Sequence, residues 1–540
     1  MRRPLRAGRA ISVLLLLGCA VGIAAAAAWF VSSGAAPRAE NLQFSTLVLD
    51  REGRLLRPYT TSDGRWRLPA ALEDVDPRYV DLLLAYEDKR FRQHIGVDPL
   101  ALLRAAYLFF RHGRIVSGGS TLTMQVARLL EPRRERSVTV KLREMARAVA
   151  LERALTKEQI LSLYLNLAPY GGNLEGIRAA SLAYFGKEPR RLFLHESALL
   201  VALPQSPELR RPDRSAQAAR GARDRVLDRV SAAGRLPADE IALAKNEPGP
   251  TGRKPMPTLA PHAADAAIMA APERRTHRLT IDATIQRSLQ DLARERARSL
   301  GNDVSVAIIA ADHATGEVLA RVAAADYFDE RRAGHVDLTQ ALRSPGSALK
   351  PFIYGLGFED GLIHPESLIE DRAVRYGSYA PQNFDLTFQG TVSVRRALQL
   401  SLNVPAVAVL EKVGASRLSA RLTQTGAALV LPKGEAPGLA MALGGVGIRL
   451  ADLTMLYAAI ARLGEAVPLV ENRDRALAEQ PRRLFEPSAA WHLGNVLAGT
   501  PPPENAPGGR IAFKTGTSYG YRDAWSVGFD GKRTIGVWVG

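Results

Sequence analysis

The chain contains Arg343-Ser344-Pro345-Gly346-Ser347-Ala348-Leu349-Lys350-Pro351, a stretch built around the motif Ser-x-x-Lys. Ser347 and Lys350 are three positions apart and would share one face of a helix, so hydroxyl and amine can meet. Gly346 lets the chain turn sharply into that helix, and Pro351 falls in its first turn, where proline is tolerated. A lysine that burial keeps neutral can take the proton of a serine hydroxyl and make it a nucleophile. Alone, the motif also fits an ordinary solvated helix start.

Two later segments favour the chemical interpretation. Ser401-Leu402-Asn403 follows an amphipathic run, and Lys514-Thr515-Gly516-Thr517 follows an apolar run and is typical of a strand end. Gly516 would leave room for a substrate to lie along the strand edge. The order Ser-x-x-Lys, Ser-x-Asn, Lys-Thr-Gly is the set shared by penicillin-binding proteins and class A β-lactamases, and the chain resembles them in this respect.

The composition fits several domains with sizeable cores. The chain has 540 residues, of which 46% are hydrophobic and 24% are charged. It carries 72 Lys and Arg against 55 Asp and Glu, a net charge of +17, which indicates an anionic partner such as membrane headgroups, phosphorylated substrates or nucleic acid. Its single cysteine excludes a disulfide within the chain and a cysteine metal cluster.

Residues 11–31 carry no charge and could cross the hydrocarbon core of a bilayer, about 30 Å thick. Arginines in the predicted cytoplasmic tail, residues 1–10, place the N-terminus inside and the rest of the chain outside, which argues against nucleic acid as a partner. The run is longer than an ordinary signal-peptide core, so we favour a retained anchor over a cleaved signal peptide. A lipoprotein cleavage site at Cys19 is a third alternative, and the apolar run past Cys19 argues against it.

Residues 41–236 have the pattern of a mostly helical domain. Asp98 followed by Pro99 predicts a helix start. The helix expected there carries an apolar and aromatic cluster that ends in cations, which fits a membrane interface or an ordinary core helix. Residues 117–125 form a polar, glycine-containing loop that could hold an oxygen-rich group at a helix N-terminus, and residues 128–153 are a basic helical tract.

A linker over residues 237–275, rich in proline and glycine, is expected to lead to a second domain at residues 276–540. Two hairpin signals stand out in the second domain. One is the turn sequence between β-rich residues 304–310 and 317–323, and the other is Asp530-Gly531. We therefore predict an antiparallel sheet with helices packed on it.

From residue 41 to residue 540 the sequence resembles a class A penicillin-binding protein, a bifunctional peptidoglycan synthase. Glu87-Asp88-x-x-Phe91-x-x-His94-x-Gly96 matches the first motif of glycosyltransferase family 51 without a break, and residues 118–125 are similar to the second. Lys141-Leu142-Arg143-Glu144 resembles the third, although Val140 stands where an arginine is expected. The last two motifs have counterparts in residues 158–166 and 195–207.

The resemblance implies a multidomain fold. It would comprise an N-terminal transmembrane helix, a mostly α, lysozyme-like glycosyltransferase domain, and an α+β transpeptidase domain of the penicillin-binding and β-lactamase type. Residues 117–130, 343–351 and 514–524 look like the subtype called penicillin-binding protein 1C. Members of that subtype usually carry a further C-terminal domain, so we expect these residues to be part of a longer chain.

For the front domain, the resemblance implies that lipid-linked disaccharide units are joined while polyprenyl pyrophosphate leaves. Glu87 is the expected general base, and Lys141 the cation that stabilises the leaving pyrophosphate. Glu144 is a second catalytic carboxylate, either as a ligand of a divalent metal (Mg or Mn) or as a group that orients Lys141. Further residues are expected to bind substrate: Asp88, His94, Ser120, Thr121 and Gln125.

For the second domain, the resemblance implies that Ser347 attacks a D-Ala-D-Ala peptide bond and forms an acyl-enzyme, which an amine of another stem peptide then accepts. Lys350 is the expected base, Ser401 relays the proton and Asn403 fixes the substrate amide. The backbone N–H groups of Ser347 and Thr517 would form the oxyanion hole. The strand segment that would tune charge and hold the substrate carboxylate comprises Lys514, Thr515, Gly516 and Thr517.

Three functions remain open. Both motif sets favour a bifunctional synthase; the alternatives are a glycan polymerase whose penicillin-binding domain is only a sensor or scaffold, and a non-enzymatic envelope scaffold. The apolar N-terminal run and the front domain argue against a soluble β-lactamase. Expected partners are lipid II, nascent glycan, the bacterial inner membrane, β-lactams as inhibitors and other envelope proteins, with no nucleic acid and no organic cofactor. The catalytic domains would be periplasmic on a single-pass protein.

The C-terminal end carries a further expectation. In the family that the chain resembles, an N-terminal and a C-terminal helix together cover one face of the central sheet. The first is expected over residues 283–300, but none follows the last predicted strand, residues 534–539. A bare face would forfeit about 1.5–3 kcal/mol for each large side chain, so we expect weak acylation and early unfolding of this domain. Equal acylation rates and melting temperatures for this chain and one extended by the helix would contradict that.

Overall fold

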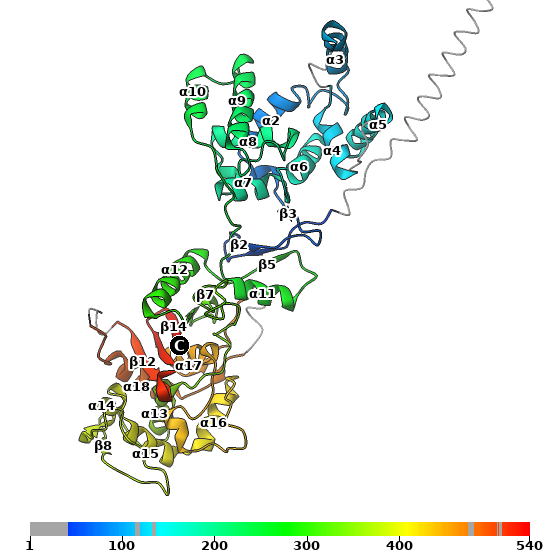
Figure 1. Ribbon diagram of the computed structural model, residues 1–540. Helices are drawn as coiled ribbons and strands as arrows, with labels where there is room; N and C mark the ends of the chain where they lie inside the picture. Colours follow the sequence, from blue (N-terminus) through cyan, green and yellow to red (C-terminus); the bar gives the residue numbers. More distant parts are fainter. Residues whose placement is uncertain (1–41, 114–118, 132–136, 474–479, 505, 507–509) are drawn as a thin grey trace, which may run out of the picture. The chain divides into compact units, whose positions relative to one another are not determined.

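A computed structural model of the protein describes residues 42–113, 119–131, 137–473, 480–504, 506 and 510–540 (Figure 1). The predicted anchor at residues 11–31 and Cys19 lie outside these residues. Among the helices that are described, none has the length and apolar character needed to span a bilayer. The chain forms two compact units, one containing Pro58–Met256 and the other containing Leu47–Arg57 and Pro257–Gly540.

The first unit is mostly helical, as predicted. Helix α8 is almost fully buried, with α2 and α9 packed against it. The helices are α2 (Pro77–Glu87), α3 (Pro99–His112), α4 (Leu122–Leu130), α5 (Val138–Ala154), α6 (Lys157–Leu167), α7 (Ile177–Phe185), α8 (Leu194–Ala202), α9 (Ala216–Ala232) and α10 (Ala238–Asn246). Two short strands, β3 (Trp66–Arg67) and β4 (Leu174–Glu175), pair in parallel.

Side-chain caps fix where helices of this unit begin. The Asp98 carboxylate accepts the N–H of Ala101 at 3.0 Å at the start of α3, and Pro99 is the first residue of that helix, as predicted. Thr156 forms a capping box with Gln159 before α6. The basic tract at residues 128–153 falls into two helices, α4 and α5.

The second unit contains a five-stranded antiparallel sheet in the order β12-β13-β14-β6-β7, and both predicted hairpins are confirmed. Its strands include β5 (Thr276–Arg278), β6 (Val306–Asp312), β7 (Val318–Val322), β8 (Leu368–Asp371), β9 (Gly390–Ser393), β10 (Glu465–Ala466), β11 (Arg482–Arg483), β12 (Ala512–Thr517), β13 (Ala524–Phe529) and β14 (Arg533–Val539). Its helices are α11 (Pro261–Ala270), α12 (Ala283–Leu300), η4 (Gly346–Leu349), α13 (Lys350–Glu359), α14 (Val394–Gln399), α15 (Asn403–Val413), α16 (Ala415–Gln424), η5 (Leu439–Leu443), α17 (Leu450–Ala461) and α18 (Pro487–Ala498).

Helices pack on both faces of this sheet, but the α12 face is left partly open over β12, β13 and β14. Helix α12 packs on β6 and β7, and α17 packs on β13 and β14 (Figure 1). Along β14, Gly536 and Trp538 face the α17 side, whereas Val537 and Val539 join the cluster beneath α12. This alternation follows from the period of two in a strand. Ile535 is 39% exposed and lines a groove over β12, β13 and β14.

Two segments do not belong to the domains to which the sequence analysis assigned them. Strand β1 (Leu47–Leu49) pairs in parallel with β5, and β2 (Leu55–Pro58) pairs with β1, so Leu47–Arg57 belongs to the second unit although it precedes the first. The segment expected to be a linker, residues 237–275, contains two helices. Helix α10 packs on α8 and α9 in the first unit, and α11 belongs to the second unit.

The contact between β14 and α17 yields a stability prediction. A Cβ at Gly536 would overlap the Thr454 hydroxyl and lie 2.9 Å from Leu450 Cδ1. Gly536→Ala should therefore destabilise the second unit by about 1–3 kcal/mol through overpacking, measured by denaturant unfolding. Gly531→Ala is the matched control, because a Cβ at Gly531 would meet nothing within 4 Å. Equal stability of the two variants would contradict the packing argument.

Candidate active sites

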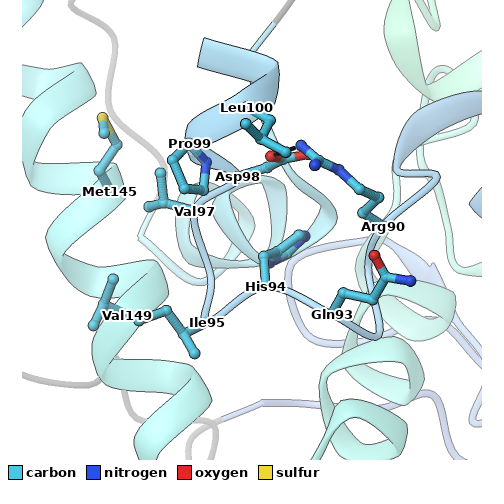
Figure 2. A pocket seen from close by; sticks show the side chains of 10 residues that line it. All are labelled: Arg90, Gln93, His94, Ile95, Val97, Asp98, Pro99, Leu100, Met145 and Val149. Carbon is cyan, nitrogen blue, oxygen red and sulfur yellow. Dashed lines mark hydrogen bonds and ion pairs between the residues drawn. The ribbon is translucent and has the colours of Figure 1, made fainter. Parts of the chain in front are cut away.

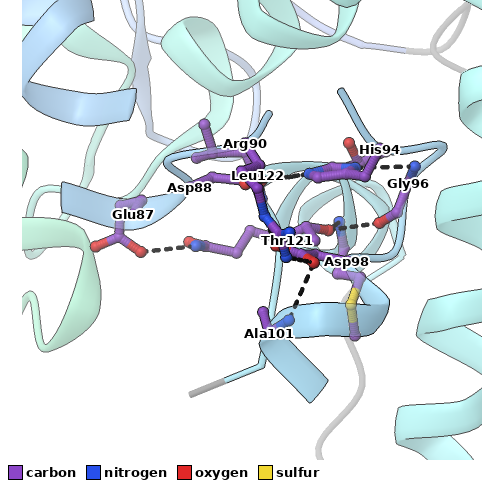
Figure 3. Close-up of polar contacts among 12 residues, drawn as sticks. Glu87, Asp88, Arg90, His94, Gly96, Asp98, Ala101, Thr121 and Leu122 are labelled. Atoms are coloured by element: carbon purple, nitrogen blue, oxygen red, sulfur yellow. Dashed lines mark hydrogen bonds and ion pairs between the residues drawn. The ribbon is translucent and has the colours of Figure 1, made fainter. Parts of the chain in front are cut away.

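Glu87, the predicted base of the front domain, is held by two primary amides, and Figure 3 draws one of these two contacts. Its Oε2 accepts from Gln125 Nε2 of α4 at 2.9 Å, and its Oε1 accepts from Gln205 Nε2 at 2.5 Å. The amides fix the carboxylate without adding charge, and each oxygen keeps a lone pair for a further donor. Burial raises the pKa of the neighbouring Tyr164 phenol, and the charge of Glu87 adds to this rise. The arrangement suits an acceptor of a proton from a hydroxyl.

Asp88 follows the last residue of α2, and its carboxylate turns toward the start of α4. It accepts the N–H of Leu122 at 2.9 Å and lies 3.0 Å from His94 Nε2. His94 Nδ1 accepts the N–H of Gly96, so Nε2 carries the proton and donates to Asp88. Both residues were predicted to bind substrate, yet they are buried and bonded to each other. They join the α2–α3 loop to α4.

Thr121 caps α4 and ties it to the same loop. Its hydroxyl accepts the N–H of Met124 at 3.1 Å and donates to the carbonyl of Gly96 at 2.6 Å. Gly96 has φ +96°, and a Cβ there would lie 2.5 Å from the carbonyl oxygen of Ala148 in α5. Only glycine therefore lets the α2–α3 loop reach both α4 and α5.

Lys141 on α5 donates to the Ser120 hydroxyl and lies 3.8 Å from the Glu144 carboxylate. Burial lowers the pKa of Lys141, and the nearby Glu144 opposes that shift. Among the described residues, no group of three or more His, Cys, Asp and Glu side chains could hold a metal ion. Glu144 fits a divalent cation only if phosphate oxygens of a substrate complete the ligands, a mode that Mg²⁺ often uses.

A cavity of about 550 Å³ lies between the α2–α3 loop and α5 (Figure 2). Arg90 and Asp98 form an ion pair at its polar side. Its apolar walls are Ile95, Val97, Leu100, Met145 and Val149. On α3, Leu103, Tyr107 and Phe110 are each more than 60% exposed. These exposures contradict the core-helix alternative for this segment.

In the second unit, Ser347 lies in η4, directly before α13, and two glycines bring this turn against strand β12. Gly346 has φ +52°, as its predicted sharp turn requires, and a Cβ there would lie 2.8 Å from Thr517 N. A Cβ at Gly516 would lie 2.7 Å from Ala348 N. The space that a Cβ at Gly516 would need is therefore filled by the backbone beside Ser347.

Lys350 is fully buried at the start of α13. Its Nζ donates to the carbonyl of Ser401 at 2.6 Å, to the carbonyl of Leu402 at 3.2 Å and to Asn403 Oδ1 at 2.6 Å. Burial lowers the pKa of Lys350 well below its usual range, and the neighbouring charge of Lys514 lowers it further. The structure thus brings the Ser-x-x-Lys and Ser-x-Asn motifs together through Lys350. Ser401 takes φ +63°, which is uncommon for a residue other than glycine.

Residues of the Lys-Thr-Gly strand alternate between a buried and an exposed face, as is usual in a β-strand. Lys514 and Gly516 are buried, whereas Thr515 and Thr517 are exposed on the other face. Lys514 Nζ donates to the Thr515 carbonyl at 3.1 Å, and burial lowers the pKa of Lys514 to about 8. The two threonine side chains remain accessible to a substrate.

Two residues that touch the sites were not singled out from the sequence. Gln205 lies within residues 195–207, which were matched to a motif only as a whole. Asn383, whose Oδ1 accepts the N–H of Asn403 at 2.8 Å, lies in no motif. Neither carries a local sequence signal, because each contact joins segments that are distant in the chain.

The buried Lys514 predicts a pH-dependent stability. Between about pH 8 and its ordinary pKa of 10.5, the unfolded chain binds a proton that the folded chain does not. Stability therefore rises with pH across this window. Lys514→Met lacks the buried cation and should exceed the wild type in unfolding free energy by up to about 3 kcal/mol at pH 7. In guanidinium titrations this advantage should shrink toward pH 10; an advantage independent of pH would contradict the assignment.

Comparisons with known proteins also divide the chain into a front part and a second part. The Transglycosylase family matches residues 52–231, and the Penicillin binding protein transpeptidase domain matches residues 306–540. Penicillin-binding protein 1C of Escherichia coli strain K12 is 44% identical over 92% of this chain and 64% of its own length. Penicillin-binding protein 1F of Bacillus subtilis strain 168 is 28% identical over 92% of this chain and 74% of its own length.

Among solved structures, the 2.6 Å crystal structure of penicillin-binding protein 1A from Haemophilus influenzae is 16% identical in sequence. It covers 93% of this chain and 88% of that one, with a TM-score of 0.49. The chain spans 64% of the length of the Escherichia coli relative.

Proposed function

Because this chain belongs to the class A penicillin-binding proteins, which join a transglycosylase domain to a transpeptidase domain, we propose that it is a bifunctional peptidoglycan synthase. It polymerises lipid II into glycan strands and cross-links stem peptides through a serine acyl-enzyme. The observation that carries the proposal is the buried Lys350, which lies between the Ser-x-Asn loop and the turn that bears Ser347. A domain that served only as a sensor would not need a base in that place.

In the first domain, Glu87 takes the proton of a sugar 4-hydroxyl whose oxygen attacks the anomeric carbon of the next unit. The new glycosidic bond forms as the bond to the pyrophosphate oxygen breaks, and polyprenyl pyrophosphate leaves with the electron pair. Gln125 and Gln205 hold Glu87 in place, and Lys141 offsets the charge of the leaving group. A divalent cation on Glu144 and the pyrophosphate oxygens would supply further positive charge.

In the second domain, the Ser347 hydroxyl attacks the carbonyl between the two D-alanines, and Lys350 takes its proton. The ester bond to Ser347 forms, the peptide bond breaks, and the terminal D-alanine leaves with a proton relayed through Ser401. An amine of a second stem peptide then attacks the ester and regenerates the serine. Asn403 orients the substrate amide, and Thr515 and Thr517 hold the terminal carboxylate.

The chain is proposed to be a single-pass inner-membrane protein whose catalytic domains face the periplasm. The uncharged residues 11–31 behind four arginines and the exposed apolar residues of α3 support this placement. Alkaline phosphatase fused after Gly540 should be active, because that enzyme needs the periplasm. A mature N-terminus at Cys19 would instead establish the lipoprotein alternative.

Glu87→Gln should abolish glycan polymerisation from lipid II, by about 10²–10⁴-fold, because glutamine keeps the shape of the side chain but cannot accept the proton. Labelling by fluorescent penicillin should be unchanged in this variant. Glu73→Gln, an exposed glutamate in the same unit, is the matched control and should polymerise normally. Wild-type polymer from Glu87→Gln would overturn the assignment.

Ser347→Ala should lose all covalent labelling by penicillin and keep glycan polymerisation, since the variant lacks only the second nucleophile. Ser344→Ala is the control, because the Ser344 hydroxyl donates to the Gly444 carbonyl at 2.7 Å and has no proposed part in the reaction. Mass spectrometry should find the penicillin adduct on Ser347. An adduct on Ser344 would show that the register is wrong.

A further inference from the structure

Helix α15 begins at Asn403 without a cap of its own. The preceding residue, Leu402, has no side-chain oxygen, so the first N–H groups of the helix need acceptors from elsewhere. Asn383, in the loop between β8 and β9, supplies such an acceptor. Its Oδ1 accepts the N–H of Asn403 at 2.8 Å and that of Val404 at 3.4 Å. A side chain distant in sequence therefore fixes where α15 begins.

A buried carboxylate fixes the orientation of Asn383. Both oxygens of Asp371, which is 0% exposed, accept from Asn383 Nδ2 at 2.8 and 2.9 Å. One of them also accepts the N–H of Gln389 at 2.8 Å. None of the ion pairs found among the described residues includes Asp371. Because the nitrogen of the Asn383 amide faces this carboxylate, its oxygen must face α15.

The same loop also holds the side chain of Asn403. Asn403 Nδ2 donates to the carbonyl of Gln382 at 2.7 Å, next to Asn383. Its Oδ1 is thereby turned toward Lys350 Nζ, 2.6 Å away. The second hydrogen of Nδ2 stays available for a substrate amide. The contacts form one continuous chain from Asp371 through Asn383 and Asn403 to Lys350.

We propose that Asp371 and Asn383 are positioning residues of the acylation site, which place Asn403 and through it the amine of Lys350. The inference rests on the proposed transpeptidase function. A purely structural role would reduce the amount of folded domain, whereas a positioning role slows acylation in protein that is folded and still binds the β-lactam.

The test exchanges the two polar groups in the full-length chain, solubilised in detergent. Asp371→Asn sets an amide against the Asn383 amide, and Asn383→Asp sets two carboxylates against each other. The double variant restores one amide facing one carboxylate, with an oxygen still turned toward α15. It does not restore the bond at 2.9 Å from Asn383 Nδ2 to the Thr387 carbonyl, so recovery should be partial. Asp385→Asn is the matched control, because Asp385 is exposed in the same loop and bonds only Thr387.

Stopped-flow measurements with a fluorescent penicillin separate its initial binding constant from the acylation rate. Each single variant should acylate at least about tenfold more slowly, the rate equivalent of ~1.4 kcal/mol, with the binding constant nearly unchanged. The double variant should recover at least half of that loss on a logarithmic scale, and Asp385→Asn should match the wild type. Asn383→Ala, which creates no repulsion, replaces any single variant that melts below the assay temperature.

Three results would overturn the inference: folded single variants that acylate at the wild-type rate, a double variant as slow as the single ones, or a loss that follows only the folded fraction seen by circular dichroism. Polymerisation of lipid II should be unchanged throughout. A wild-type chain that does not acylate at all would overturn the proposed transpeptidase function itself, and this inference with it.

Discussion

The proposed acylation site depends on a close approach between two pieces of backbone, the η4 turn and strand β12. Side chains at Gly346 or Gly516 would overlap the opposite backbone, so the approach needs glycine on both sides. Because the turn is pressed against the strand, Lys350 enters the core rather than solvent. Its amine then loses water and meets carbonyl and amide oxygens of the Ser401 loop. The chemical result is a Lys350 amine whose pKa burial lowers well below its usual range.

In the front domain the proposed reactive group is a carboxylate rather than an amine, and it is held in a different way. To act as the proposed base, Glu87 must remain able to accept a proton, and it is held by uncharged amides rather than by a cation that would lower its basicity. The cation of that site, Lys141, lies instead beside Ser120 and Glu144. In both domains the reactive group comes from the end or the beginning of a helix, and a contact from a distant segment fixes its position.

Short-range patterns made much of this fold predictable. The cap at Asp98 and the two hairpin turns act within a few residues, and all are confirmed. The contacts that the sequence did not reveal join distant segments: Leu47–Arg57 in the second unit, Gln205 on Glu87, and Asn383 on Asn403. A motif identifies a reactive residue, but the residues that hold it carry no signal in a single sequence because their proximity arises only from the tertiary path.

The central claim, that one chain carries two working sites, is tested most directly by supplying purified lipid II to the full-length protein with and without penicillin. The account predicts glycan polymer in both samples and peptide cross-links only in the sample without penicillin, as seen in muropeptides released by a muramidase. Polymer without cross-links in both samples would contradict the claim and leave the second domain as a sensor or scaffold.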